Sequence, residues 1–183
     1  MKDIYIVLTN TGTMLSSIIK YWTKNRNTHV SIALDRDLVE LYSFGRVNPY
    51  NAFIGGFVKE GIDIGTFKRF SNTTTQIYSL SVTEEQYRKI QETIWDVQNN
   101  RETYKFNIIG LLFAGFNKNR TRKNKFYCAE FVKYVLYSSR IDAVNYSLII
   151  KPEDFKKISN LRLIYQGLLK EYNMKKVNKL QYL

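Results

Sequence analysis

The chain is poor in the residues that form disulfides, metal sites and long linkers. Its 183 residues include one cysteine, one histidine, two prolines and nine glycines. A single cysteine excludes an intramolecular disulfide, and one cysteine with one histidine cannot supply the usual ligands of a zinc site. We therefore expect no metal and no cofactor. So little proline and glycine favours a single domain over residues 1–183, with residues 170–183 as a basic carboxyl-terminal tail.

Long apolar runs and nucleotide-binding motifs are also absent. The longest apolar stretch, residues 108–116, is too short to span a bilayer, and the run at residues 4–8 is too short for a signal-peptide core. Because a lone cysteine suits a reducing compartment, we expect a cytoplasmic protein. We find no glycine-rich phosphate loop, no serine in a nucleophile-elbow pattern and no specific nucleic-acid motif.

Positive charge, in contrast, is abundant. The net charge is +12, which permits binding to an anionic surface without demonstrating it. Five basic residues gather shortly before the cysteine: Lys118, Arg120, Arg122, Lys123 and Lys125. They form either a solvated loop or an electropositive rim that contacts an anionic membrane or another anionic surface.

The only cysteine opens a strongly patterned segment, residues 124–136. After Cys128, the apolar residues Phe131, Val132, Val135 and Leu136 recur at helical spacing, which predicts a helix with the cysteine in its first turn. The free N–H groups and partial positive charge of a helix amino terminus favour a thiolate. The ordinary alternative is a buried cysteine that acts only as a small, inert apolar side chain.

The only histidine lies in a predicted strand, residues 28–34. A period of two puts His29, Ser31 and Ala33 on one face, which is small and polar and leaves room for a substrate. The alternative for His29 is a surface residue at the start of a strand. Together, however, one cysteine and one histidine are the minimum for a cysteine nucleophile with a histidine base.

The segments 28–33 and 126–132 resemble the circularly permuted papain-like group of the NlpC/P60 superfamily. The resemblance is closest to the YiiX-like permuted amidases, with the lecithin:retinol acyltransferase-like proteins as more distant relatives. In this group the histidine strand precedes the cysteine helix, as it does here. Weaker matches at residues 3–7 and 151–155 extend the resemblance over roughly residues 1–165.

A catalytic imidazole is normally oriented by a third group, and the resemblance places that group on the next strand. We predict a turn at residues 35–37 and a return strand at 38–44, in which Glu40 is the only acid. With a two-residue turn, Tyr42 faces His29 and Glu40 lies about 6.6 Å along the strand. With a three-residue turn, Ser43 would face His29 instead. Glu40 is thus the first candidate and Tyr42 the second.

The resemblance implies an α+β fold in which an antiparallel, barrel-like sheet packs against helices. It also implies amide hydrolysis through a thioester on Cys128, with a peptide-like or N-acyl substrate and His29 as the base. Two alternatives stay open. One is a lipid acyltransferase or thioesterase at anionic membranes; the other is a non-catalytic binding module on the same scaffold.

The rest of the chain carries weaker signals. Thr83 and Gln86 form a capping-box pattern that starts a helix with a buried stripe including Ile94 and Trp95. Residues 45–61 resemble a loop because of their glycines and Asn48-Pro49. The remaining predicted elements are strands at 4–8, 73–82 and 161–165 and helices at 13–23, 107–116 and 152–158.

Overall fold

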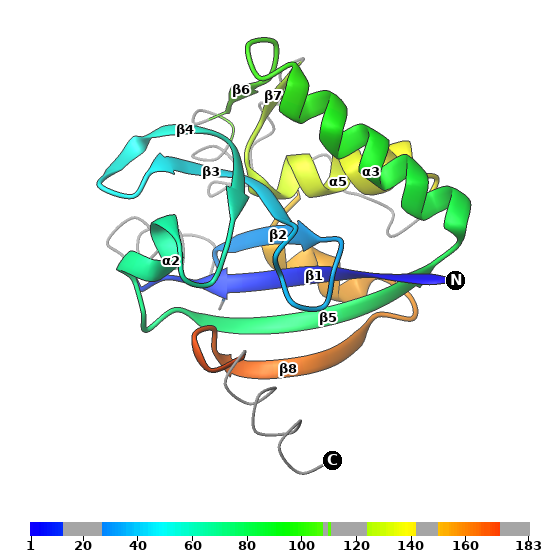
Figure 1. Ribbon diagram of the computed structural model, residues 1–183, viewed down its shortest axis with the longest axis horizontal. Coiled ribbons are helices and arrows are strands. Elements are labelled where there is room, and N and C mark those ends of the chain that lie inside the picture. Colours follow the sequence, from blue (N-terminus) through cyan, green and yellow to red (C-terminus); the bar gives the residue numbers. More distant parts are fainter. Residues whose placement is uncertain (13–26, 108–109, 111–123, 142–149, 173–183) are drawn as a thin grey trace.

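The computed structural model describes residues 1–12, 27–107, 110, 124–141 and 150–172 (Figure 1). In chain order the elements are β1 (Lys2–Asn10), β2 (His29–Ala33), β3 (Leu41–Asn48), β4 (Asn51–Glu60), α2 (Gly65–Arg69), β5 (Thr74–Val82), α3 (Glu84–Asn99), β6 (Lys105–Phe106), β7 (Lys125–Phe126), α5 (Cys128–Ser138), the 3-10 helix η1 (Pro152–Lys157) and β8 (Arg162–Leu168).

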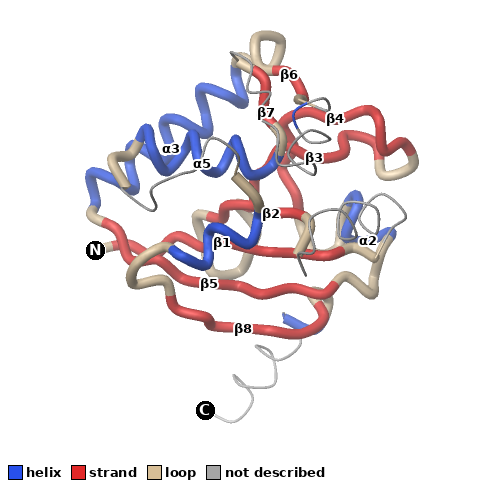
Figure 2. Tube along the Cα trace, turned by 180° about the vertical axis from the view of Figure 1, so that it is seen from behind, coloured by secondary structure: helices blue, strands red, loops and turns tan. Residues whose placement is uncertain are grey.

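Six of these strands form one antiparallel sheet in the order β4-β3-β2-β1-β5-β8. The two short strands β6 and β7 pair in parallel beside it. Helices α3 and α5 lie side by side against the sheet, as both views show (Figures 1 and 2). The expected α+β class, with its antiparallel sheet, is therefore confirmed. None of the helices in the described ranges combines the length and apolar character needed to cross a membrane.

The sheet is built around β1, whose residues 4–8 are all buried. Because side chains alternate along a strand, Ile4 and Ile6 enter the core that contains α3 and α5, whereas Tyr5 and Val7 enter a second core on the other face. Phe67 of α2 belongs to that second core. Burial on both faces explains why this strand appears in the sequence as a continuous apolar run.

Helix α3 begins as the capping box predicts. The Thr83 hydroxyl accepts a hydrogen bond from the Gln86 backbone N–H (3.1 Å), and the Gln86 side chain accepts one from the Thr83 N–H (3.0 Å). Ile90 and Ile94 are fully buried, as expected, but Trp95 is 50% exposed and does not join the stripe. It follows Ile94 directly, and one residue turns a helix by about 100°, so the tryptophan faces away from the sheet.

The predicted loop at residues 45–61 is wrong, because most of it forms the β3–β4 hairpin. The turn lies between Asn48 and Asn51, and Gly45, Gly55 and Gly56 sit inside the strands, while Gly61 follows the end of β4. Gly55 shows why: a Cβ atom there would stand 2.6 Å from the ring of Phe106 in β6. The glycine lets that ring pack directly on the backbone, a tertiary contact that local sequence does not reveal.

The other predicted elements divide into two groups. The strands at 4–8, 73–82 and 161–165 correspond to β1, β5 and β8, while the segment after Lys151 is a 3-10 helix instead of an α-helix. The predicted helix at 13–23, almost all of the one at 107–116, and the end of the basic tail lie outside the described residues.

Candidate active site

Cys128 is the first residue of α5, and it is 4% exposed. The apolar face that begins with it is buried against β2 and β3, as the spacing predicted. The amino terminus of the helix is held by Glu130, whose carboxylate accepts hydrogen bonds from the Tyr127 backbone N–H and from the Asn107 side chain, both at 3.1 Å. The Tyr127 hydroxyl in turn donates to the Ile150 carbonyl (2.8 Å). The backbone around the thiol is therefore fixed by long-range contacts.

His29 is the first residue of β2, and its ring lies near the thiol. The Cys128 side chain is close enough to the imidazole to help raise its pKa, although 99 residues separate the two in the chain. On its other side the ring nitrogen Nε2 lies 2.9 Å from Oε1 of Glu60, and Phe67 packs edge-on with 6.4 Å between ring centres. Since a carboxylate only accepts hydrogen bonds, Nε2 donates its proton to the hydrogen bond with Glu60.

Glu60 ends β4 and is itself held in place. Its second oxygen, Oε2, accepts a hydrogen bond of 2.5 Å from the hydroxyl of Ser31, a neighbour of His29 on the same face of β2. Ser43 lies in the same polar cluster and gives weaker support. Gly45 lies beside both groups, because a Cβ there would stand in ordinary contact, 3.4 Å, with Cε1 of His29 and Oε1 of Glu60. The imidazole and the carboxylate are thus fixed by three neighbouring strands.

Opposite charges dominate the electrostatics of this cluster. Burial alone would lower the pKa of His29, but the charge of Glu60, with the hydrogen bond and charge of Cys128, outweighs it and raises the pKa to about 10. Burial would likewise raise the pKa of Glu60, yet the charge of His29 and hydrogen bonds from its neighbours hold it below the ordinary value. At neutral pH the pair is an imidazolium facing a carboxylate.

The residue that orients His29 is therefore Glu60, and the structure places neither Glu40 nor Tyr42 beside the imidazole. Burial and the charge of the nearby Glu40 raise the pKa of the Tyr42 hydroxyl to about 12. Glu40 also pairs with Lys59 at 3.4 Å. Tyr42 faces the core that contains α5, where it stacks on Phe57.

The expected turn length caused this error. Residues 35–39 form the connection, longer than predicted, and the Asp35 carboxylate closes it by accepting hydrogen bonds from the backbone N–H groups of Val39 and Glu40. The resulting register pairs Ile32 with Tyr42, so the backbone beside His29 is that of Gly45. Glu60 was overlooked because its strand lay in the predicted loop, and no local signal shows that β4, which β3 separates from β2, brings a carboxylate to His29.

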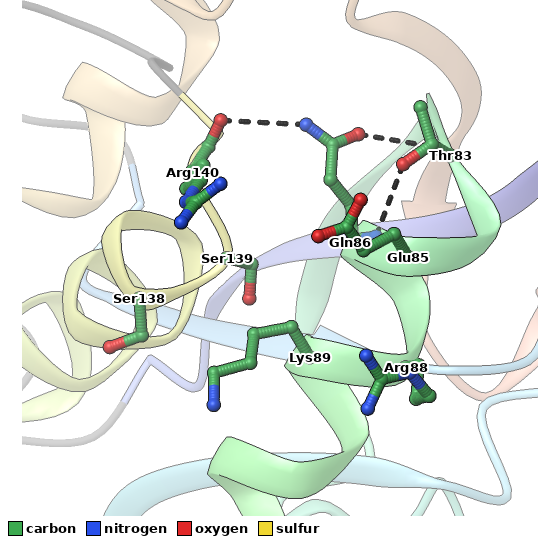
Figure 3. Close-up of a pocket in the computed structure, with 8 residues that line it drawn as sticks. All are labelled: Thr83, Glu85, Gln86, Arg88, Lys89, Ser138, Ser139 and Arg140. Atoms are coloured by element: carbon green, nitrogen blue, oxygen red, sulfur yellow. Dashed lines mark hydrogen bonds between the residues drawn. The ribbon is translucent and has the colours of Figure 1, made fainter.

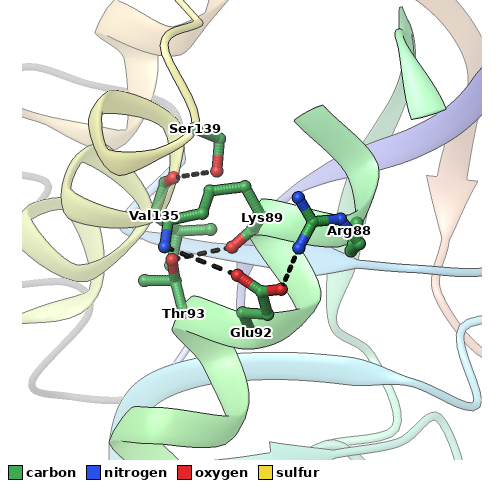
Figure 4. A network of polar contacts seen from close by, with 6 residues as sticks. All are labelled: Arg88, Lys89, Glu92, Thr93, Val135 and Ser139. Atoms are coloured by element: carbon green, nitrogen blue, oxygen red, sulfur yellow. Dashed lines mark hydrogen bonds and ion pairs between the residues drawn. The ribbon is translucent and has the colours of Figure 1, made fainter. Parts of the chain in front are cut away.

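A hollow of about 410 Å³ lies elsewhere, between the start of α3 and the end of α5 (Figure 3). It is lined by Thr83, Glu85, Gln86, Arg88, Lys89, Ser138, Ser139 and Arg140. Figure 4 shows that Glu92 forms ion pairs with both Arg88 and Lys89, and that the Ser139 hydroxyl donates to the Val135 carbonyl. The lining holds no cysteine or histidine, so it lacks the thiol and imidazole found at the other end of α5.

The basic rim proposed from the sequence is only partly visible. Lys118, Arg120, Arg122 and Lys123 lie outside the described residues, and Lys125 lies in β7, two residues before the N-cap of α5. The expected contact of this segment with an anionic surface stays a prediction.

The arrangement brings together a thiol, an imidazole near it and a carboxylate bound to the imidazole, the side-chain types that covalent catalysis by a cysteine requires. Comparison with protein-family models and with curated proteins gave no match to this chain.

Proposed function

We propose that the protein is a cysteine-dependent amide hydrolase that acts through a thioester on a peptide-like or N-acyl substrate. The observation that carries this proposal is the proximity of Cys128 to His29, whose ring nitrogen Nε2 binds Glu60. A buried cysteine that only fills space in the core does not require an imidazole beside it. A histidine that only supports the fold does not require an ion pair with a carboxylate that a serine also holds in place.

In the first half-reaction, the thiolate of Cys128, whose proton the His29 imidazolium already holds, attacks the carbonyl carbon of the amide. The carbon–nitrogen bond then breaks, and the imidazolium gives its proton to the departing amine, which leaves a thioester on Sγ. Glu60 favours the imidazolium throughout because its carboxylate lies 2.9 Å from Nε2. The same carboxylate keeps the ring from rotating away from the thiol.

In the second half-reaction, His29 removes a proton from water, and the hydroxide attacks the thioester carbon. The carbon–sulfur bond breaks, the carboxylic acid leaves and the thiol is restored, so that one amide and one water yield one amine and one acid. Both half-reactions pass through an oxyanion. The backbone N–H of Cys128, in the first turn of α5, is the donor best placed to stabilise it.

For the scaffold, we propose the circularly permuted papain-like arrangement. Support comes from the order of the parts: the histidine strand β2 precedes the cysteine helix α5, and α5 packs on the sheet that contains β2. The antiparallel pairing of all six strands is consistent with the same scheme.

The proposal is tested by the rate at which iodoacetamide alkylates Cys128 as a function of pH. Because the chain has no other cysteine, every label reports this site. At about pH 6 a free thiol is almost fully protonated and reacts slowly. We expect the wild-type protein to react at that pH at a large fraction of its maximal rate, and His29→Ala to lose this low-pH reactivity. An amide and ester substrate screen then identifies the bond that is cleaved.

Ser139→Ala is the matched control, because Ser139 is a buried hydroxyl residue at the far end of α5. It should leave the pH profile of alkylation unchanged. The proposed dyad would be overturned if Cys128 reacted as slowly as a free thiol at about pH 6 and if wild type and His29→Ala did not differ. That result would favour a binding module.

A further inference from the structure

A second hollow, of about 260 Å³, lies where the sheet meets the segment before β2. It is lined by Asn27, by the start of β5 from Thr74 to Gln76, and by the end of β8 from Gln166 to Leu168. None of these residues carries a charge. Side-chain amides and hydroxyls therefore supply its polar groups, which suits a neutral ligand that both donates and accepts hydrogen bonds.

A carboxylate just outside the hollow fixes the orientation of its amides. Oε1 of Glu153, which is ion-paired with Lys156, accepts hydrogen bonds from the Asn27 backbone N–H (2.8 Å) and from Asn27 Nδ2 (2.9 Å). Because a carboxylate only accepts hydrogen bonds, the Asn27 amide must turn its nitrogen toward it. The same nitrogen donates to Gln76 Oε1 (2.9 Å), and Gln76 Nε2 then donates to Gln166 Oε1 (2.7 Å).

This chain of hydrogen bonds leaves one acceptor and one donor for a ligand. Asn27 is only 3% exposed, yet no group among the described residues donates to its carbonyl oxygen Oδ1. Gln166 is exposed, and its nitrogen Nε2 has no acceptor in the same part of the chain. A buried polar side chain with an unused acceptor is uncommon and calls for a partner. An acceptor beside a donor matches the N–H and C=O of a peptide group.

The register of the sheet relates the hollow to His29. His29 pairs with Thr9 of β1, Thr9 with Thr75 of β5, and Thr75 with Gly167 of β8. The four residues form one row across the sheet, in which β1 and β5 are neighbours (Figure 1), and the last two line the hollow. Because neighbouring strands are about 4.8 Å apart, Thr75 lies about 10 Å from His29, a distance that about three residues of extended peptide cover.

From these contacts we infer that the hollow is a subsite for a peptide group of the substrate, about three residues from the bond that is cleaved. Asn27 Oδ1 accepts a hydrogen bond from the N–H of this group, and Gln166 Nε2 donates one to its C=O. The inference rests on the proposed function, since it makes the substrate of that site a peptide of several residues instead of a simple N-acyl amide.

Hydrolysis of a long and a short substrate with the same cleaved bond tests the subsite. The long substrate is an N-acyl pentapeptide amide, and the short one is an N-acyl amino acid amide that does not reach the hollow. In Gln166→Glu the donor is replaced by a further acceptor. We expect KM for the long substrate to rise about 3- to 10-fold relative to KM for the short one, as for the loss of one hydrogen bond.

Gln91→Glu is the matched control, because it makes the same change of charge on α3, outside the hollow. It should leave the ratio of the two KM values unchanged. If Gln166→Glu also left this ratio unchanged, the subsite would be overturned while the proposed hydrolase stayed intact.

A change in the substrate tests Asn27 without any effect on folding. In a series of long substrates, one peptide group at a time is replaced by an ester, which removes a single N–H. We expect KM to rise about 3- to 10-fold for the ester that lies about three residues from the cleaved bond, and less for the esters on either side of it. The same KM for every ester in the series would exclude Asn27 as an acceptor of the substrate.

Binding to Cys128→Ala, which cannot form the thioester, separates this inference from the proposed function. The probes are the fluorescently labelled pentapeptide amide and maltotriose, a neutral sugar whose hydroxyls also donate and accept hydrogen bonds. Weaker peptide binding in Cys128→Ala with Gln166→Glu would support the peptide site, even if the wild type hydrolysed no amide and the proposed hydrolase failed.

Two results of this binding experiment would overturn the inference. Gln166-dependent binding of maltotriose alone would show that the hollow takes a sugar instead of a peptide group. If neither probe binds in a Gln166-dependent manner, the subsite does not exist, whatever the outcome of the hydrolysis assays.

Discussion

The two ends of α5 carry two clusters of charged and polar side chains that differ in almost every physical respect. At the amino terminus, Cys128, His29 and Glu60 come from three separate elements, and the His29 and Glu60 side chains are only 19% and 11% exposed. At the carboxyl terminus, Glu92 binds two cations of its own helix α3, and its side chain is 42% exposed. The clusters are about 15 Å apart along the helix.

The comparison indicates which charged groups are expected to affect stability and reactivity most. An ion pair within one exposed helix is screened by water and contributes a few tenths of a kcal/mol. A buried pair between strands is strongly coupled, so removing one partner leaves an uncompensated charge. The same contrast applies to reactivity, because only the buried cluster can change the protonation of a nucleophile. Substitutions at the two ends should therefore have effects of very different size.

Cys128→Ala should have the largest effect, since it removes the proposed nucleophile. We expect kcat/KM for amide hydrolysis to fall at least about a thousandfold, as when nucleophiles are removed from other hydrolases. The measurement is steady-state hydrolysis of the best substrate from the screen. Ser139→Ala, at the opposite end of α5, should change the same constant less than about twofold. Full activity in Cys128→Ala would remove the thioester mechanism.

Glu60→Gln should have the second largest effect, because it leaves the His29 imidazolium buried without its counter-ion. We expect the free energy of unfolding at about pH 6 to fall by about 3–5 kcal/mol, measured by urea unfolding. The depressed pKa of Glu60 stabilises the fold above the ordinary value of 4.5, and this contribution is lost as pH falls. The raised pKa of His29 stabilises it below 6.5, and this contribution is lost as pH rises through about 10.

The difference between wild type and Glu60→Gln should thus be greatest between about pH 4.5 and 6.5 and should shrink on both sides. The alkaline limb of kcat/KM should also move to lower pH in the variant, because the imidazolium loses its support. Glu40→Gln is the control, since Glu40 pairs with Lys59 at the surface. If Glu40→Gln moved the limb and Glu60→Gln did not, the sequence-based choice of Glu40 would be right after all.

Ser31→Ala should have an intermediate effect, since it removes the hydrogen bond to Oε2 of Glu60. We expect a loss of about 1.5–3 kcal/mol in the free energy of unfolding, typical of a hydrogen bond to a charged group. Ser43→Ala is a close match, because Ser43 is equally buried and its hydroxyl has no hydrogen bond of ordinary geometry among the described residues. It should cost less than Ser31→Ala. The reverse order in urea unfolding would show that Ser43 is the main support of Glu60.

Glu92→Gln should have the smallest effect, because its partners Arg88 and Lys89 are exposed and lie on the same helix. We expect the free energy of unfolding to change by less than about 1 kcal/mol. Added salt should reduce this small difference further. If Glu92→Gln lowered the free energy of unfolding as much as Glu60→Gln does, burial would not explain the difference between the two ends of α5.

Local sequence patterns correctly predicted several of the helices and strands. The continuous apolar run at residues 4–8, the capping box at Thr83 and the apolar face that begins at Cys128 are local signals, and each gave the correct element. The Gly-rich hairpin was mistaken for a loop because Gly55 is required by the ring of Phe106, about 50 residues away in the chain. Trp95 was assigned to a core that it does not enter.

By itself, the sequence determined which residues could carry covalent catalysis: with one cysteine and one histidine, Cys128 and His29 are the only candidates. Local periodicity also placed them on a helix start and a strand start. Only the tertiary structure decided that they meet, and that Glu60 instead of Glu40 orients the imidazole. The physical reason is register: the Asp35-closed connection at residues 35–39 and the pairing of β3 with β4 set which carboxylate reaches His29.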